Sequence, residues 1–139
     1  MKQEFISINL IDPNPYQPRQ VEDIGFITEI AASIKKNGLM QVPTARVCGD
    51  RYQLAFGHTR KAAFVMNGET SMPLIINDLT DLQMFELGVA ENIKRRDLDP
   101  IEEAYAMRRY MDDFGKTSKE AAEFFGVAEE TIRQKVRWD

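Results

Sequence analysis

Three prolines fall within six residues near the start of the chain, between positions 13 and 18. Because proline lacks a backbone N–H and fixes φ, this run excludes both a helix and a central strand. It predicts a stiff, extended loop after a short strand of alternating apolar and polar residues, Phe5–Ile11. Either this stiffness aims Gln17 and Arg19 at a ligand or the loop is a rigid connector, and the residues leave both interpretations open.

Strand and helix patterns follow one another after the loop. A stripe of apolar residues at helical spacing predicts a helix at Ile27–Lys36, which Asn37 and Gly38 end. Two β-rich runs on either side of Gly49-Asp50 predict a hairpin. The two strands of this hairpin are Pro43–Cys48 and Arg51–Phe56. A further strand is predicted at Pro73–Asn77, and a helix at Asp81–Ile93 with Thr80 as its N-cap.

The second hairpin strand breaks at Gly57, and a helical pattern follows directly. A strand, a glycine turn and a helix start form an arrangement that binds anions, because the first N–H groups point outward and the helix dipole adds positive potential. Arg60 lies in that first turn, where a positive side chain makes more sense if a phosphate is bound. The alternative is an ordinary turn whose arginine lies in solvent, and a lone turn of this kind is weak evidence.

Two adjacent oxygen donors, Glu91 and Asn92, precede three basic residues at 94–96. Hard oxygen ligands beside cations are typical of a magnesium-nucleotide site. Taken alone, this stretch favours an ordinary charged helix end, in which the basic side chains complement the C-terminal dipole.

The last segment has the pattern of a helix-turn-helix. A helix begins at Pro100 with Asp99 as its N-cap, and two short helices follow at Thr117–Phe125 and Glu129–Val136. A tight Gly126-Val127 turn separates the last two, and the alternative is a plain helical hairpin. The second short helix offers long polar side chains for the major groove of DNA. The candidate DNA-binding residues are Thr131, Arg133, Gln134, Lys135 and Arg137.

Composition narrows the function classes. The 139 residues carry a net charge of −4, which argues mildly against a general nucleic-acid coat. Residues 1–115 hold 13 basic and 17 acidic side chains, whereas residues 116–139 hold five of each. The single Cys48 and single His58 exclude an intrachain disulfide and make zinc chemistry unfavourable. No apolar run is long enough for a membrane span and no secretory signal is visible, so we expect a cytoplasmic protein.

Four ordered motifs resemble the ParB family of chromosome- and plasmid-partition proteins. Its opening motif is similar to Pro13–Arg19 (PNPYQPR), and its first nucleotide motif is similar to Ser33–Pro43 (SIKKNGLMQVP). Gly57–Ala63 (GHTRKAA) occupies the place of its phosphate motif, G-E-R-R-x-R-A. Glu91–Ala104 (ENIKRRDLDPIEEA) resembles its third motif and the following helix. The helix-turn-helix follows at the expected distance, so the resemblance covers essentially the whole chain.

The resemblance implies an α+β fold. Residues 1–96 would form a ParB/sulfiredoxin-like nucleotide-binding domain with a small mixed sheet, and residues 97–139 a helical linker and a partial, all-α helix-turn-helix domain. In the family, CTP and Mg²⁺ close two such domains into a homodimeric clamp. The clamp loads at a centromere-like DNA site and slides away from it, and CTP hydrolysis permits reopening. A ParA-like ATPase is a further partner that the resemblance suggests.

The resemblance also implies roles for individual residues. Glu91 and Asn92 would hold the magnesium-triphosphate, and Arg95 would neutralise phosphate charge. Gln41 would lie near the reacting γ-phosphate. The full set expected to bind nucleotide is Gln17, Arg19, Gly38, Gln41, Gly57, His58, Thr59, Arg60, Glu91, Asn92 and Arg95, with Gln41 and His58 as candidate catalytic residues.

The chain departs from the family pattern at two positions. His58 stands where the family has the glutamate tied to hydrolysis, and Thr59 replaces its first arginine. A neutral imidazole accepts a proton near pH 7 but supplies no negative charge, so CTP binding fits the residues better than CTPase activity. Two other functions stay open: a phosphotransferase of the free-serine-kinase type, and a non-enzymatic DNA-binding transcriptional adaptor. Sulfiredoxin chemistry is disfavoured because Cys48 lies in the hairpin and not in the glycine turn.

The chain stops directly after the expected recognition helix. In the family, further helices support that helix and a separate segment dimerises. We therefore expect this sequence to be an N-terminal piece of a longer protein or a short relative, and to bind DNA poorly on its own. Glu129 and Glu130, at the start of that helix, are expected to repel phosphates.

Overall fold

The computed structural model describes residues 2–16, 24–39, 41–95 and 100–136. The chain divides into two compact units, Met1–Gly88 and Val89–Asp139. The predicted domain boundary between residues 96 and 97 falls outside the described residues. None of the helices in the described parts is long and apolar enough to cross a membrane.

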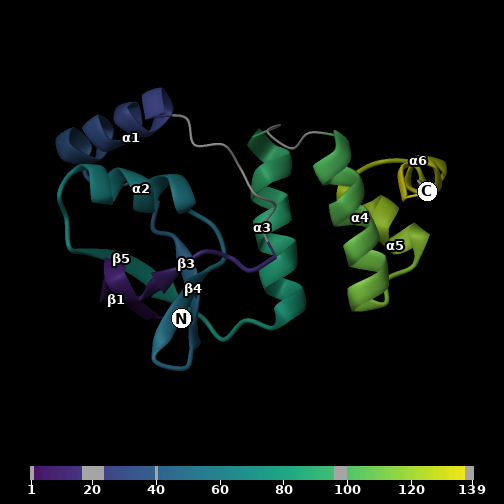
Figure 1. The fold of residues 1–139 in the computed structure, drawn as a ribbon, viewed down its shortest axis with the longest axis horizontal. Coiled ribbons are helices and arrows are strands. Elements are labelled where there is room, and N and C mark those ends of the chain that lie inside the picture. The colour runs from purple at the N-terminus through teal and green to yellow at the C-terminus, as the bar shows by residue number, and fades with distance from the viewer. Residues whose placement is uncertain (1, 17–23, 40, 96–99, 137–139) are drawn as a thin grey trace. The chain divides into compact units, whose positions relative to one another are not determined.

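The first unit is built on a mixed five-stranded sheet with the strand order β1-β5-β3-β4-β2 (Figure 1). Neighbouring strands are antiparallel in the pairs β1/β5 and β3/β4 and parallel in the pairs β3/β5 and β2/β4. The predicted α+β class and the mixed sheet are thereby confirmed. The strands are β1 (Lys2–Ser7), β2 (Ile11–Asp12), β3 (Thr44–Cys48), β4 (Arg51–Leu54) and β5 (Ser71–Ile76).

The predicted single strand at Phe5–Ile11 is wrong in its extent. The chain leaves the β1/β5 ladder after Ser7, passes through a 3₁₀ turn at Ile8–Leu10, and re-enters the sheet as β2 at the opposite edge. The physical reason is that Ile11 pairs with Tyr52 of β4, far from β5. Alternation of apolar and polar residues reports which face a side chain occupies, and it carries no information about which strand is the neighbour.

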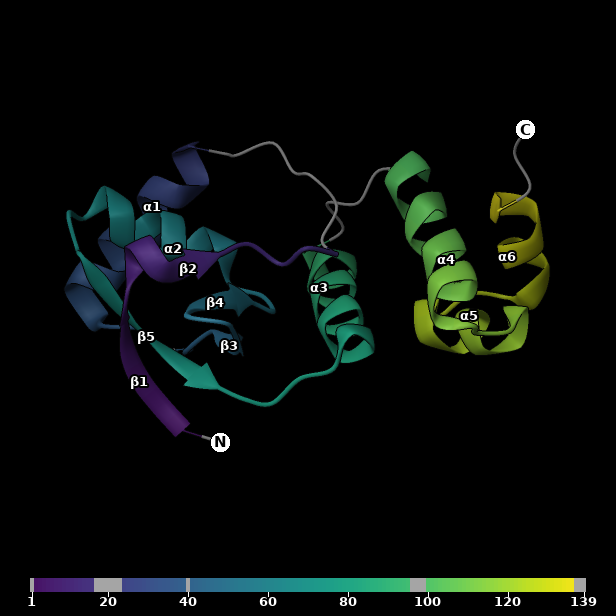
Figure 2. The same ribbon diagram turned by 60° about the horizontal axis from the view of Figure 1, so that its bottom comes forward.

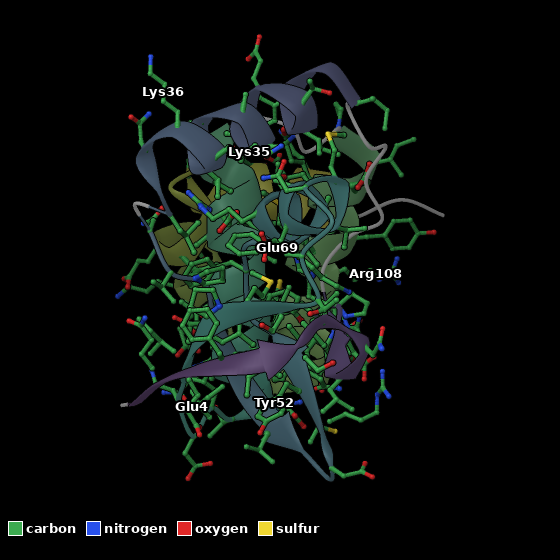
Figure 3. All side chains as sticks on the ribbon, turned by 90° about the vertical axis from the view of Figure 1, so that its left-hand side faces the viewer. Glu4, Lys35, Lys36, Tyr52, Glu69 and Arg108 are labelled. Atoms are coloured by element: carbon green, nitrogen blue, oxygen red, sulfur yellow. The ribbon has the colours of Figure 1, made fainter. Side chains whose placement is uncertain are left out.

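Two helices, α1 (Ile24–Asn37) and α2 (His58–Met66), pack against each other in this unit (Figure 2). Phe64 of α2 is buried among sheet residues, and Ile34 of α1 packs against the same cluster. Helix α1 starts at Ile24, one turn before the predicted start at Ile27. The prediction missed this turn because its residues are exposed and do not extend the buried apolar stripe. Its last turn carries two exposed lysines, Lys35 and Lys36, which complement the helix dipole (Figure 3).

Helix α3 (Asp81–Arg95) begins where it was predicted to begin. The Thr80 hydroxyl accepts from the Gln83 N–H at 3.1 Å, and the Gln83 side-chain oxygen accepts from the Thr80 N–H at 2.9 Å. This reciprocal pair is a capping box, so Thr80 is confirmed as the N-cap.

The second unit holds α4 (Pro100–Phe114), α5 (Ser118–Phe125) and α6 (Glu129–Val136). Its core is aromatic: the rings of Tyr110 and Phe124 stack with centroids 4.9 Å apart, and Phe125 packs edge-on against both. Ile132 of α6 is fully buried. The two predicted short helices and the Gly126 turn between them are confirmed, with Gly126 in the left-handed conformation (φ 71°).

Candidate functional site

The glycine turn before α2 is the centre of the candidate anion site. Gly57 is the N-cap of α2 and has φ 98°, a conformation that favours glycine. A side chain at this position would place its Cβ 2.6 Å from the Cβ of Pro43, which is fully buried. Only glycine fits here, because both the backbone conformation and the space exclude a Cβ. The segment that contains Pro43 is therefore held against the start of α2.

Two of the predicted nucleotide residues meet beside this turn. The Arg60 guanidinium donates to the side-chain oxygen of Gln41 at 2.8 Å. Gln41 is exposed and Arg60 is partly exposed, so both side chains are accessible. The first turn of α2, which the structure describes in full, holds no acidic residue. A helix start beside one guanidinium, with no carboxylate in its first turn, fits a phosphate-sized anion.

His58, the first residue of α2, is joined to the proline-rich loop. The backbone N–H of Asn14 donates to His58 Nε2 at 3.0 Å. Nε2 therefore carries a lone pair, and the ring is the neutral tautomer with its proton on Nδ1, which is buried. This contact joins the start of α2 to the loop at Asn14. Proton acceptance at Nε2 would first require the loss of the Asn14 hydrogen bond.

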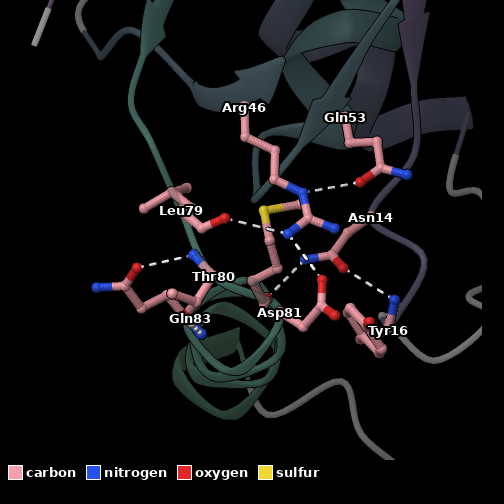
Figure 4. A network of polar contacts seen from close by, with 9 residues as sticks. Asn14, Tyr16, Arg46, Gln53, Leu79, Thr80, Asp81 and Gln83 are labelled. Carbon is pink, nitrogen blue, oxygen red and sulfur yellow. Dashed lines mark hydrogen bonds and ion pairs between the residues drawn. The ribbon is translucent and has the colours of Figure 1, made fainter. Parts of the chain in front are cut away.

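Asn14 is the buried centre of a polar network and has only 4% of its surface exposed (Figure 4). Its amide group donates to the backbone oxygens of Ala55 at 2.9 Å and Met84 at 2.8 Å, and its oxygen accepts from the Tyr16 N–H at 2.9 Å. One side chain thus joins the loop, the end of the hairpin and α3. Gly88 permits this approach, since a Cβ there would lie 2.7 Å from the Asn14 amide nitrogen.

Sequence reasoning did not assign this role to Asn14. The available signal was an amide side chain between two prolines, which fix the backbone on both sides but do not identify the acceptors.

Arg46 joins the sheet to the start of α3 in the same region (Figure 4). Its guanidinium donates to the Gln53 side-chain oxygen at 2.9 Å, to the Leu79 carbonyl at 3.1 Å and to Asp81 at 2.9 Å. The Arg46 side chain is 16% exposed, so these contacts are partly shielded from water. Arg46 therefore acts as a structural cation of this unit.

Two further cations stabilise the edge strand β2. Lys61 of α2 donates to the carbonyl of Ile11 at 2.9 Å. Arg51 forms a two-pronged contact with Asp12, with both distances 2.9 Å, and also donates to the Asn9 carbonyl. The hydrogen bond from Arg51 holds the pKa of the Asp12 carboxyl below its usual range and raises the pKa of Arg51.

Helix α6 turns a polar face outward, away from its buried residue Ile132. Glu130, Arg133 and Gln134 are exposed, and they lie at positions i, i+3 and i+4 on one side of the helix. Thr131 is only partly exposed. Lys135, also partly exposed, forms an ion pair with Glu103 of α4 at 3.1 Å.

The two glutamates at the start of α6 both contact Arg133. Its guanidinium lies 3.3 Å from Glu129 and 3.4 Å from Glu130. Glu129 also accepts from the Ser118 hydroxyl at 2.8 Å, which joins the starts of α5 and α6. The glutamates expected to repel phosphate therefore also neutralise the cation that was expected to attract it.

Two known protein-family domains together match nearly the whole chain. The ParB N-terminal domain matches residues 2–93, and the ParB HTH domain matches residues 96–138. The chain belongs to the ParB family. The resemblance predicted from the four motifs is confirmed.

Individual ParB relatives agree with this assignment. A probable chromosome-partitioning protein ParB from Coxiella burnetii is 34% identical over 132 residues, which are 95% of this chain and 46% of the relative. The chromosome-partitioning protein Spo0J of Thermus thermophilus is 38% identical over 127 residues, which are 91% of this chain and 47% of the relative. The chain thus spans about half the length of the curated relatives it matches.

Two solved ParB structures from Caulobacter crescentus share the fold. A C-terminally truncated ParB complexed to the centromeric parS site has a TM-score of 0.71 and 26% identity, covering 96% of this chain and 70% of that chain. The same protein complexed with CTP-gamma-S has a TM-score of 0.60 and 27% identity, covering 99% of this chain and 78% of that chain.

The structure describes some of the predicted ParB nucleotide residues and not others. Gln41, Gly57, His58, Thr59 and Arg60 belong to the first unit, and Gln41 and Arg60 are in contact. Gly38 has φ 80° and its N–H bonds the Ile34 carbonyl, so it ends α1 as predicted. Gln17, Arg19 and the side chains of Asn92 and Arg95 lie outside the described residues, as do Arg137 of the predicted DNA set and the predicted N-cap Asp99.

The predicted metal site is described only at Glu91. This residue is partly exposed, lies on α3 and belongs to the second unit. Among the described residues, no three His, Cys, Asp or Glu side chains come together as metal ligands.

Proposed function

We propose that this chain is the nucleotide-binding and DNA-loading part of a chromosome- or plasmid-partitioning protein, a CTP- and Mg²⁺-dependent clamp on DNA. The observation that carries the proposal is the succession of a ParB N-terminal domain and a ParB HTH domain in one chain. The solved relatives with CTP-gamma-S and with the parS site support a role for each part.

The phosphates of the nucleotide would lie at the start of α2. The N–H groups after Gly57, including that of Thr59, and the Arg60 guanidinium are the proposed phosphate ligands. Gln41, already hydrogen-bonded to Arg60, would lie near the terminal phosphate. When bound, Mg²⁺ neutralises triphosphate charge. Glu91 and Asn92 are its proposed protein ligands, with Arg95 as a further phosphate contact.

Turnover would differ from that of family members with a glutamate in this turn. His58 is neutral, and its Nε2 accepts the Asn14 N–H. The lone pair of Nε2 is therefore engaged with the loop and does not take a proton from water while this hydrogen bond is present. We propose that CTP binding and hydrolysis are separable here and that His58 serves binding. Any catalytic part of His58 or Gln41 stays a prediction.

The DNA site would be a centromere-like sequence that α6 reads in the major groove. Two copies of the chain would form the clamp, and a ParA-like ATPase would act on the assembled complex. Such a protein would work in the cytoplasm at the nucleoid or a plasmid.

Calorimetry with CTP, GTP, ATP and ADP, each with and without Mg²⁺, tests the nucleotide proposal. We expect CTP with Mg²⁺ to bind, and Arg60→Ala to weaken binding at least tenfold by removing a charge-assisted phosphate contact. Arg109→Ala is the matched control, because Arg109 is an exposed arginine on α4 that pairs with Asp113 at 3.0 Å.

Each contrary result of this panel has a meaning. If no nucleotide binds, the clamp proposal is wrong and the DNA-binding adaptor is favoured. A preference for ADP or ATP with phosphate transfer to a small hydroxyl compound would favour the phosphotransferase. Equal loss of binding in both arginine variants would contradict the assignment of the phosphates to Arg60.

A further inference from the structure

The outward face of α6 is defined by three exposed residues, Glu130, Arg133 and Gln134. They lie opposite the fully buried Ile132, so they are the residues of α6 that a ligand of this helix would meet. Their chemistry differs along the face: Glu130 only accepts hydrogen bonds, Arg133 only donates them, and Gln134 does both.

The two glutamates of α6 do different work. Glu129 accepts from the Ser118 hydroxyl at 2.8 Å and is partly buried, so it fixes the start of α6 to α5. The Glu130 side chain is 69% exposed and contacts Arg133 at 3.4 Å. A structural role explains Glu129, whereas the position of Glu130 directs an acceptor toward whatever α6 binds.

The major groove offers partners for this pair of side chains. A carboxylate accepts from the N4 amino group of cytosine, and an arginine donates to O6 and N7 of guanine. Both edges occur side by side in one G·C pair. The first residues of a recognition helix approach base edges most closely, and Glu130 is the second residue of α6.

We propose that Glu130 is a specificity-determining residue that accepts a hydrogen bond from a cytosine amino group, beside a guanine read by Arg133. This inference rests on the proposed function of α6 as the DNA-reading helix. Exposed ion pairs contribute little to stability. The pair of Glu130 and Arg133 can therefore break at a small cost in free energy, and each side chain can bind a base edge in its place. The carboxylate lowers general affinity for the phosphate backbone and raises preference for one base pair.

Selection from a pool of duplexes with a randomised core tests the proposal on the whole chain at about 50 mM salt, where the weak DNA binding that we expect of this chain is strong enough for selection. We expect the chain to enrich a G·C pair, with a preference of about tenfold over other pairs at that position. Glu130→Ala should lose this preference and bind the remaining sequences more tightly. Asp112→Asn should keep it, and this control removes a carboxylate of similar exposure, 67%, that also pairs with an arginine, Arg108.

A modified base locates the contact. Replacing the selected cytosine by 2-pyrimidinone removes the N4 amino group and leaves the phosphates unchanged. The unaltered chain should lose about tenfold in affinity for this duplex, and Glu130→Ala should lose nothing further.

Two outcomes overturn the inference in distinguishable ways. If Glu130→Ala keeps the G·C preference and gains affinity equally for every duplex, Glu130 only repels phosphate, and the proposed function stands without the inference. If the unaltered chain enriches no sequence, the proposed DNA reading by α6 is wrong, and the inference is wrong with it.

Discussion

The turn before α2 and the outer face of α6 are built by opposite means. In the first unit, Asn14, His58 and the glycine turn are held by neutral hydrogen bonds and close packing, largely away from water. In the second unit, Arg133 and Lys135 are held by ion pairs with exposed or partly exposed glutamates. The first region is fixed by hydrogen bonds between side chains and backbone groups that are largely shielded from water, and the second by ion pairs that solvent reaches.

This difference bears on what each region can bind. A buried amide that loses its partner leaves carbonyls unsatisfied, so the first region resists rearrangement and suits a ligand of constant shape such as a phosphate. Exposed ion pairs break at little cost, so the second region can exchange its internal partners for those of a variable surface such as DNA. Substitutions that remove these contacts should therefore lower the free energy of unfolding more in the first unit than in the second.

The largest effect is expected from Asn14→Ala. The substitution leaves the buried Ala55 carbonyl without its side-chain donor, takes a second donor from the Met84 carbonyl inside α3, and removes the Asn14 oxygen that accepts the Tyr16 N–H. We expect a loss of about 3–5 kcal/mol in the free energy of unfolding. Asn67→Ala is the control, because the Asn67 amide donates to a single carbonyl, that of Ala31, at a partly buried site. It should cost about 1 kcal/mol. Urea unfolding measures both, and equal losses would contradict the central place of Asn14.

Gly57→Ala should follow, at about 2–4 kcal/mol. The alanine meets both a left-handed φ and the Cβ of Pro43 at 2.6 Å. Gly68→Ala measures the effect of the left-handed backbone conformation alone, because Gly68 has φ 77° and open space around it. We expect this substitution to lower the free energy of unfolding by about 1–2 kcal/mol. Thermal unfolding of the two variants gives the difference. If Gly68→Ala is as costly, the contact with Pro43 does not stabilise the turn.

Part of this fold could be predicted from the sequence. Elements bounded by local signals were predicted correctly: Thr80 caps the start of α3, Gly38 ends α1, and Gly126 separates α5 from α6. Such signals act over a few residues, so the sequence contains them entirely.

Features that depend on distant partners could not be predicted. The passage of the chain from β1 to the opposite sheet edge follows from the pairing of Ile11 with Tyr52, which no local pattern encodes. The partners of Asn14 are as many as 70 residues away along the chain. At the candidate site, motif order singled out Arg60 and Gln41, which the structure brings into contact and whose part in nucleotide binding stays a prediction. The contact between Asn14 and His58 could be found only in the structure.

A smaller effect is expected at the pair of Glu103 and Lys135. Glu103→Gln should change the free energy of unfolding by less than about 1 kcal/mol, because both side chains are partly exposed. It should free Lys135 for phosphate and steepen the salt dependence of DNA binding by about one unit of log–log slope. Asp113→Asn on the same helix is the control and should leave the slope unchanged. A large loss of stability in Glu103→Gln would remove the contrast between the two units.

The smallest effects concern pH. The hydrogen bond from Arg51 lowers the pKa of Asp12 in the first unit, and the backbone hydrogen bond at Thr117 lowers the pKa of Glu120 in the second. A carboxyl with a lowered folded-state pKa stabilises the fold above its ordinary pKa near 4, and this contribution disappears as pH falls through the folded-state value. The urea concentration at the midpoint of unfolding should therefore decrease as the pH is lowered below about 4. The decrease should be smaller in Asp12→Asn and in Glu120→Gln. Parallel pH profiles in all three proteins would contradict this assignment.

The most direct measurement is a map of backbone amide shifts by NMR during titration of the whole chain with CTP and Mg²⁺. We expect the amides of residues 57–61 and Gln41 to shift first and those of α6 not to shift. A duplex carrying the selected sequence should reverse the pattern and shift α6. Nucleotide shifts that avoid residues 57–61 would contradict the assignment of the phosphate site to the turn before α2.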